Sequence, residues 1–142
     1  CSNNYEPYQD SEKFVPTVIK SLKKDEPVEI YGDGKNVREW IHVDDHCEAL
    51  LIILIEGIAG EIYNIGSGSR FTNLEIVDLI SKLMGLKKYE KKFIQDRKGH
   101  DFRYSLNSTK IKENFKWSPK VTLEEGLKDL IVNYEIYQRN MK

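Results

Sequence analysis

The sequence has 142 residues, of which 39% are hydrophobic and 32% charged, and 22 Lys and Arg against 23 Asp and Glu give a formal net charge of −1. The longest apolar run, residues 49–55, is too short to cross a bilayer, and the apolar content is too high for a disordered chain. A balanced charge gives no general attraction to nucleic acid or anionic lipid, so phosphate binding requires a local site.

The first half of the chain alternates between helical and extended patterns. Apolar residues at helical spacing predict a helix over residues 12–24, and residues 28–31 predict a strand that ends in a glycine turn. Residues 37–43 read as extended. Asp45 and Glu48 form a capping-box pattern, which predicts a helix from Asp45 to about Gly57. Its expected apolar face consists of Cys47, Leu50, Leu51 and Leu54.

The second half continues the alternation and predicts an α/β fold in one domain spanning residues 1–142. Two further capping boxes, Thr72 with Glu75 and Thr122 with Glu125, mark helix starts. The predicted elements are a strand over 61–65, a helix over 73–84, a strand over 89–94, a helix over 108–114 and a helix from 122 to about 140. Two irregular polar stretches, residues 3–11 and 95–107, are expected to be binding loops.

Neither cysteine suggests a disulfide. Cys1 and Cys47 form no framework and no CxxC pair, which favours a reducing compartment, and no signal-peptide pattern opens the sequence. We therefore expect a cytoplasmic protein. Because the first residue is Cys1 rather than Met, we also expect a fragment of a longer polypeptide.

The loop over residues 96–104 gathers two Arg, one Lys and one His around Gly99. Guanidinium groups bind diphosphates in a planar fork, and a glycine lets backbone N–H groups approach the ligand. A solvated loop whose charges pair with one another explains the same composition, so both interpretations stay open. The amides and phenols of residues 3–8 could bind a base or sugar, although the residues alone favour turn chemistry.

Two other motifs are better explained by turns than by catalysis or cofactor binding. Tyr31 and Lys35 match Tyr-x-x-x-Lys, but the intervening glycines place them in a turn, where the pair is not catalytic. Phe71 stands where a dinucleotide loop beginning at Gly66 needs its third glycine, so these glycines are expected to form a tight strand-to-helix turn.

The polar residues of segment 42–47, His42, Asp44, Asp45, His46 and Cys47, lack zinc-ligand spacing, and we expect them to be structural. The sequence contains no nucleophile elbow and no P-loop. From the residues alone, it supports an anion-binding domain with no visible catalytic or metal centre.

Seven motifs follow one another along almost the whole chain. They are CSNNYEPYQ at 1–9, EKFVP at 12–16, YGDGKNVREW at 31–40, VDDHC at 43–47, YNIG at 63–66, DRKGHDFRY at 96–104 and WSP at 117–119. In this order they resemble the C-terminal part of the dTDP-glucose 4,6-dehydratases, which are extended short-chain dehydrogenases/reductases. The Asp-Arg-x-Gly-His-Asp loop favours this family over related epimerases and decarboxylases.

The resemblance implies a division of labour between two halves of an enzyme. In that family an NAD-binding Rossmann half precedes a smaller sugar-nucleotide-binding half. NAD oxidises the sugar at C4, water leaves across C5 and C6, and the hydride returns to C6, which yields dTDP-4-keto-6-deoxyglucose. The glycine fingerprint, the Tyr-x-x-x-Lys pair and the acidic residues all lie in the N-terminal half. We thus expect part of a lyase, inactive alone, with a homodimer for the full-length enzyme.

The resemblance also assigns binding roles. Asn3 and Arg38 would contact the diphosphate, and Asn4 would approach NAD. Lys13 and Phe14 would line the nucleotide side, and Glu29, Ile30 and Tyr31 would flank the thymine of a dTDP-sugar. The remaining expected residues of the nucleotide pocket are Asn73, Asp96, Arg97, Lys98, Gly99 and His100.

Two positions depart from the family pattern, because Glu6 replaces a usual Gly and Lys98 a usual Pro. Glu6 would repel a nearby diphosphate and disfavour a positive φ, whereas Lys98 adds a compatible charge and loosens the loop.

The alternatives to a dTDP-glucose 4,6-dehydratase are a UDP-sugar epimerase or decarboxylase and a non-catalytic nucleotide-sugar-binding module. Strand 61–65 is expected to join the sheet of the absent half, so the chain should expose apolar surface and be marginally stable or self-associate.

Overall fold

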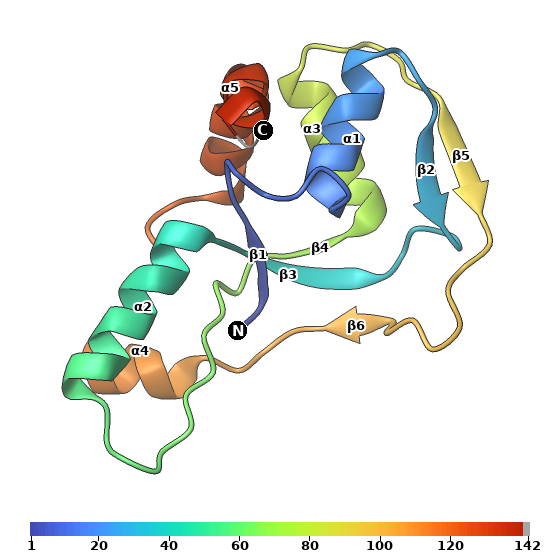
Figure 1. Cartoon of the computed structure of the whole chain (residues 1–142). Helices are drawn as coiled ribbons and strands as arrows, with labels where there is room; N and C mark the ends of the chain where they lie inside the picture. Colours follow the sequence, from blue (N-terminus) through green and yellow to red (C-terminus); the bar gives the residue numbers. More distant parts are fainter. Residues whose placement is uncertain (141–142) are drawn as a thin grey trace.

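The computed structural model describes residues 1–140 and has a mixed α/β architecture, as the sequence predicts (Figure 1). Its elements in chain order are β1 (Asn3–Tyr5), α1 (Phe14–Lys23), β2 (Val28–Tyr31), β3 (Val37–His42), α2 (Val43–Glu56), β4 (Arg70–Thr72), α3 (Asn73–Leu83), β5 (Lys91–Ile94), β6 (Arg103–Tyr104), α4 (Thr109–Phe115) and α5 (Leu123–Asn140). No helix among these residues is long and apolar enough to cross a membrane.

Strand β3 organises the larger sheet. β1 pairs with it in parallel, with Asn3 opposite Trp40, while β4 pairs antiparallel and β6 parallel at its other end. β2 and β5 form a separate parallel pair in which Tyr31 lies opposite Ile94. Strand β3 thus contacts β1 at one end and β4 and β6 at the other, although these strands are up to about 100 residues apart in the sequence.

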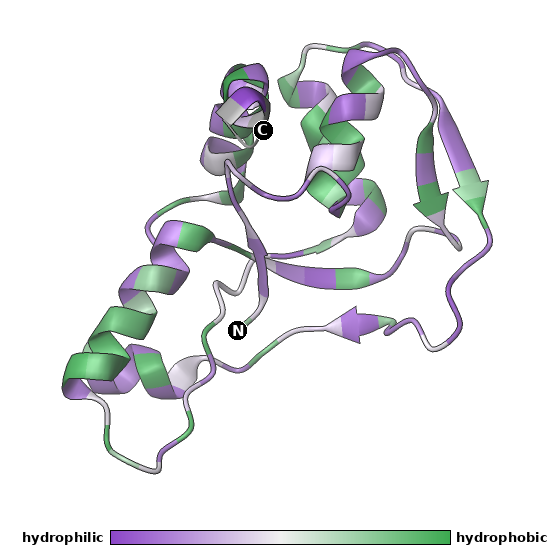
Figure 2. Ribbon diagram, viewed as in Figure 1, coloured by the Kyte–Doolittle hydropathy of each residue, from purple (hydrophilic) through white to green (hydrophobic). Residues whose placement is uncertain are grey.

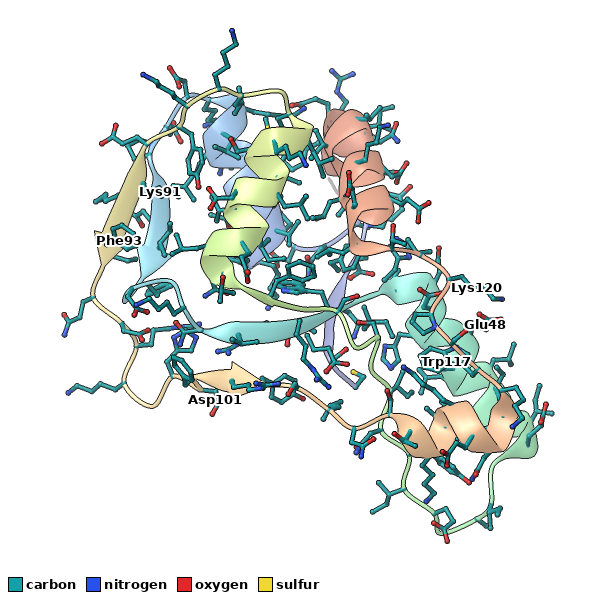
Figure 3. The ribbon with its side chains drawn as sticks, turned by 180° about the vertical axis from the view of Figure 1, so that it is seen from behind. Glu48, Lys91, Phe93, Asp101, Trp117 and Lys120 are labelled. Atoms are coloured by element: carbon teal, nitrogen blue, oxygen red, sulfur yellow. The ribbon has the colours of Figure 1, made fainter. Side chains whose placement is uncertain are left out.

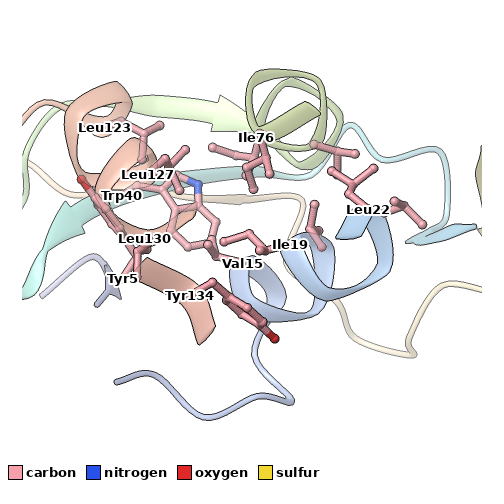
Figure 4. Close-up of a cluster of buried hydrophobic side chains, with 14 of the residues drawn as sticks. Tyr5, Val15, Ile19, Leu22, Trp40, Ile76, Leu123, Leu127, Leu130 and Tyr134 are labelled. Carbon is pink, nitrogen blue, oxygen red and sulfur yellow. The ribbon is translucent and has the colours of Figure 1, made fainter. Parts of the chain in front are cut away.

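The three-helix lobe, which we define as α1, α3 and α5 with the strands they cover, holds the main core (Figures 1 and 4). Fifteen buried apolar residues of the described chain belong to it, among them Ile19, Ile76 and Leu127. Tyr5 joins β1 to α5, because its hydroxyl donates to Thr122 O at 3.3 Å and its ring fills the space that a Cβ at Gly126 would need.

The two-helix lobe, which we define as α2, α4 and the loop over residues 57–69, has a much smaller core. Five buried apolar residues form it within the described part of the chain: Ile41, Ala49, Ile65, Ile111 and Trp117. Seen from behind, Trp117 lies beside α2, and Lys120 reaches Glu48 across the same junction (Figure 3).

The start of α2 differs from the predicted capping box at Asp45. His42 is the N-cap, and its Nδ1 accepts a hydrogen bond from Asp44 N at 3.3 Å. Asp45 is instead buried, and its carboxylate accepts from the backbone N–H groups of Lys120 and Val121 at 2.9 and 3.0 Å. The carboxylate of Asp45, which the local sequence pattern predicts to cap α2, is therefore used in a long-range contact with residues 120–121.

The predicted apolar face of α2 is also wrong. Leu50, Leu51 and Leu54 are 49%, 56% and 82% exposed, and Cys47 is exposed as well. The opposite face, around Ala49, packs on the small core. The helix is apolar on both faces, as its hydropathy colouring shows in Figure 2, so periodicity alone cannot identify the buried side.

The predicted strand over residues 61–65 is absent from the described structure. Within the described residues this segment pairs with no strand, although Ser2 N donates to Ile65 O at 2.9 Å. Conversely, β1, β4 and β6 were not predicted, because strands of two or three residues carry no alternation and depend on pairing with β3. The helices at 73–84 and 122–140 and their capping boxes are confirmed.

Candidate functional site

A cavity of about 380 Å³ lies where the start of α1 faces β1, β3 and the β2–β5 pair. Nine of the residues expected to bind a nucleotide sugar line it: Asn3, Lys13, Phe14, Glu29, Tyr31, Arg38, Asn73, Arg97 and His100. Four further lining residues were missed, namely Glu12, Thr17, Trp40 and Ile94. Residues spread over almost 100 positions of the chain thus meet in one hollow.

The alternation of β1 separates the two asparagines, because successive side chains of a strand point to opposite faces. Asn3 lines the cavity, whereas Asn4 lies on the other side. There Asn4 Nδ2 donates to Ser2 O at 3.2 Å, and its Oδ1 lies 2.9 Å from His46 Nδ1. Burial lowers the pKa of His46.

Aromatic rings form one wall of the cavity. Phe14, the first residue of α1, stacks on the buried Trp40 with ring centroids 6.1 Å apart and an interplanar angle of 26°. Lys13 precedes Phe14 as the N-cap and makes no capping hydrogen bond. Its ammonium therefore takes no part in capping α1.

Arg38 is held in position by backbone oxygens. Its Nη1 donates to Val37 O at 2.8 Å and its Nη2 to Asp101 O at 2.7 Å. Asn36 Nδ2 also donates to Asp101 O, at 3.2 Å, which ties the loop before β6 to β3. A guanidinium has five N–H donors, so these bonds orient Arg38 and leave others for a ligand.

The β2–β5 end of the cavity carries a second guanidinium. Arg97 Cζ lies 4.9 Å above the centre of the Tyr31 ring, within the range of a cation–π contact. His100 approaches the same ring edge-on at a centroid distance of 6.4 Å.

The loop after β5 is held by a chain of hydrogen bonds. His100 Nδ1 lies 2.6 Å from Asp96 Oδ1, and Arg97 Nη2 lies 3.1 Å from His100 Nε2. Because arginine can only donate, Nε2 accepts and Nδ1 donates to the carboxylate. The hydrogen bond from His100 is the main cause that lowers the pKa of Asp96. The composition of this loop is compatible both with ligand binding and with charges that pair with one another. The structure shows the internal pairing, and Arg97 and His100 also line the cavity.

Four expected residues do not line the cavity. Ile30 is 1% exposed and belongs to the main core, since it alternates with Glu29 and Tyr31 along β2. Asp96 acts through His100, while Lys98 and Gly99 lie in the exposed outer part of the loop, where Gly99 has φ +74°.

Glu6 is not a lining residue either, and it does not have a positive φ. Among the residues described, the non-glycine positions with positive φ are Asp25 and Lys116. The expected conflict between Glu6 and the backbone conformation is therefore not found.

The buried carboxylate of Glu39, which was not predicted from the sequence, lies between the lining residues Arg38 and Trp40 on β3 and holds two loops against that strand. It accepts from Gly68 N at 2.9 Å and Leu106 N at 3.0 Å, and it pairs with Arg70 Nε at 3.4 Å. A Cβ at Gly66 would collide with the same carboxylate. Gly66 therefore fits over Glu39 where a side chain would not, and β4 rather than a helix follows this segment.

The remaining motifs have local roles. Lys35 lies in the turn after β2 and pairs with Asp33 at 3.3 Å, and His42, Asp45 and His46 make the contacts given above. In residues 1–140 no group of three His, Cys, Asp or Glu side chains is arranged to hold a metal ion. A separate groove of about 490 Å³ between α1 and α5 contains none of the expected residues; four of its seven lining residues are basic, namely Lys20, Lys23, Lys24 and Arg139.

Known proteins are similar to this chain in sequence and in fold. Residues 1–130 match the family model described as GDP-mannose 4,6 dehydratase. A dTDP-glucose 4,6-dehydratase of Streptomyces niveus is 43% identical over 94% of this chain and 40% of its own length. The solved dTDP-glucose 4,6-dehydratase of Streptomyces venezuelae, with NAD bound, has a TM-score of 0.93 and 39% identity over 100% of this chain and 44% of its own.

A second kind of enzyme has a similar structure. The UDP-glucose 4-epimerase of Thermotoga maritima, solved with UDP-glucose, has a TM-score of 0.85 and 33% identity over 99% of this chain and 45% of its own. In both cases the chain spans less than half the length of the protein it matches, and it spans about two fifths of the curated relatives.

Proposed function

This chain belongs to the GDP-mannose 4,6 dehydratase family, and from that premise we propose that it is the nucleotide-sugar-binding part of an NAD-dependent dTDP-glucose 4,6-dehydratase. The observation that carries the proposal is the single cavity that gathers nine expected residues from six segments of the chain. The full-length enzyme would convert dTDP-glucose to dTDP-4-keto-6-deoxyglucose.

The cavity has the chemistry that a nucleoside diphosphate requires. Lys13, Arg38 and Arg97 supply three cationic groups, and Arg38 is already oriented by two backbone oxygens. Guanidinium groups bind phosphate oxygens through paired, charge-assisted hydrogen bonds. The diphosphate would therefore lie against Arg38 and Asn3, and the base would lie at the β2–β5 end beside Tyr31.

The part of the chain that the structure describes offers little support for a dinucleotide site of its own. Asn4, the residue expected near NAD, already contacts Ser2 O and His46 through its amide. Phe71 replaces the third glycine of a fingerprint beginning at Gly66, and the preceding strand is absent within residues 1–140. We therefore assign NAD binding and the catalytic groups mainly to the remaining part of the full-length enzyme, and we expect this chain alone to be inactive.

The exposed face of α2 is where that remaining part would pack. Leu50, Leu51, Leu54 and Ile55 are all at least 49% exposed, and the loop that follows exposes Ile58 and Ile62 by 65% and 81%. Such a contiguous apolar surface is typical of an interface rather than of a solvated helix. Curated relatives are about two and a half times as long as this chain, which supplies ample sequence to cover it.

The nearest alternative is a UDP-sugar epimerase, which the resemblance to the Thermotoga maritima enzyme supports. Calorimetric titration of the chain with dTDP-glucose and UDP-glucose separates the two. We expect tighter binding of dTDP-glucose, and Arg38→Ala should weaken both ligands. Preference for UDP-glucose would favour the epimerase, and failure to bind either would contradict a self-sufficient nucleotide pocket in this chain.

A further inference from the structure

We propose that Ile94 is the residue that recognises the 5-methyl group of a thymine base, an inference that rests on the proposed function. Thymine and uracil present the same hydrogen-bonding groups and differ only in that methyl group. No polar side chain can therefore distinguish them through a hydrogen bond, and selection requires an apolar contact.

Ile94 is the single aliphatic side chain among the described residues that line the cavity. It is half-buried, and it is the last residue of β5. Phe14 and Trp40, the other apolar lining residues apart from Tyr31, stack on each other and belong to α1 and β3. The β2–β5 end of the cavity thus has one aliphatic group.

The pairing of β2 with β5 places Ile94 beside the expected base. Tyr31 and Ile94 are directly opposite each other in a parallel register, and directly paired residues point to the same face of a sheet. The preceding same-face pair, Glu29 and Lys92, is joined by a salt bridge of 2.7 Å. The face of the β2–β5 sheet that carries Tyr31 and Ile94 therefore also carries the Glu29–Lys92 salt bridge, one step earlier along both strands.

The Tyr31 ring is not free on both sides. Arg97 lies 4.9 Å above its centre, a distance that leaves no room for a base between the two groups. A base at this end would therefore rest against the Tyr31–Ile94 pair on its open side. The resemblance implied that Ile30 flanks the thymine, but Ile30 faces the core. The aliphatic side chain at this end of the cavity is instead Ile94, on the neighbouring strand.

The test compares dTDP with dUDP, which differ only in the 5-methyl group. We expect the chain to bind dTDP about fourfold more tightly, the ratio that corresponds to burying one methyl group. Ile94→Ala should bring the ratio to about one and leave the affinity for dUDP almost unchanged. Ile94→Val, which removes a single methylene, should give an intermediate ratio and guards against a folding defect in the alanine variant.

Phe93→Ala is the matched control. Phe93 precedes Ile94 on β5, is 55% exposed and lies at the outer edge of the molecule, away from the cavity lining (Figure 3). It should keep the wild-type ratio. An unchanged ratio in both Ile94 variants, or equal binding of dTDP and dUDP by the wild type, would overturn the assignment of Ile94 but not nucleotide binding. Failure of the wild type to bind either would contradict the self-sufficient nucleotide pocket on which this inference and the proposed binding role both rest.

Discussion

The two lobes of this chain bury apolar side chains to different extents. The three-helix lobe buries fifteen apolar residues of the described chain and borders the cavity, whereas the two-helix lobe buries five. In the latter, α2 turns Leu54 and Ile55 to solvent with exposures of 82% and 71%. Burial of apolar surface is the main source of stability, so we expect the first lobe to be the more stable of the two and the exposed face of the second to be an interface.

The largest expected difference between the lobes is thermodynamic. Leu127 is fully buried in the main core, so Leu127→Ala should lower the free energy of unfolding by about 2–5 kcal/mol. Leu54→Ala, at an exposed position, should change it by less than about 0.5 kcal/mol. Urea unfolding followed by circular dichroism measures both, and similar losses in the two variants would show that the lobes do not differ in this way.

A second prediction concerns ligand binding at the three-helix lobe. Arg38→Ala removes a pre-oriented guanidinium, and hydrogen bonds to charged groups contribute about 1.5–3 kcal/mol. The affinity for dTDP-glucose should therefore fall roughly 10- to 100-fold. Arg103→Ala, a change in an exposed arginine of β6 that does not line the cavity, is the control and should bind normally.

A third prediction concerns the exposed face of the two-helix lobe. If it lacks its partner, the chain should self-associate with rising concentration, and Leu54→Lys should weaken that association at least tenfold, as measured by sedimentation velocity. Val132→Lys provides the comparison, because Val132 is 71% exposed on α5. A monomeric wild type, or equal effects of both lysines, would argue against an interface on α2.

The smallest effect is expected in the loop of the cavity. The hydrogen bond from His100 lowers the pKa of Asp96, so ionised Asp96 stabilises the folded loop at pH values above the ordinary carboxyl pKa. That contribution is lost as the pH falls through the lowered pKa of the folded state. Carbon NMR titration should give a lower midpoint for Asp96 in the chain than in a peptide of residues 95–104. Equal midpoints would contradict the observed contact.

The accuracy of sequence reasoning also differs between the lobes. The periodic helices α1, α3 and α5 were predicted because each has one apolar stripe that the core accepts. In α2 both faces are apolar, and the buried one depends on contacts with β1 and β3 that no local pattern encodes. The strand predicted over residues 61–65 needs a neighbouring strand that residues 1–140 do not provide.

For the cavity, the family resemblance identified most of the lining, while elementary geometry explains the exceptions. Strand alternation alone excludes Ile30 once Glu29 and Tyr31 face the cavity. Ile94 could not be found in this way, because its role depends on the register of β5 against β2. Glu39 was missed because it contacts loops that follow it by about 30 and 67 positions.

The most direct test of this division is hydrogen exchange of the chain with and without dTDP-glucose. We expect dTDP-glucose to slow amide hydrogen exchange at the start of α1, in β3 and in the loop over residues 95–100, and to leave exchange in α2 unchanged. Protection confined to α2, or no protection anywhere at saturating ligand, would contradict the claim that the three-helix lobe carries the nucleotide-sugar site and that the two-helix lobe awaits a partner.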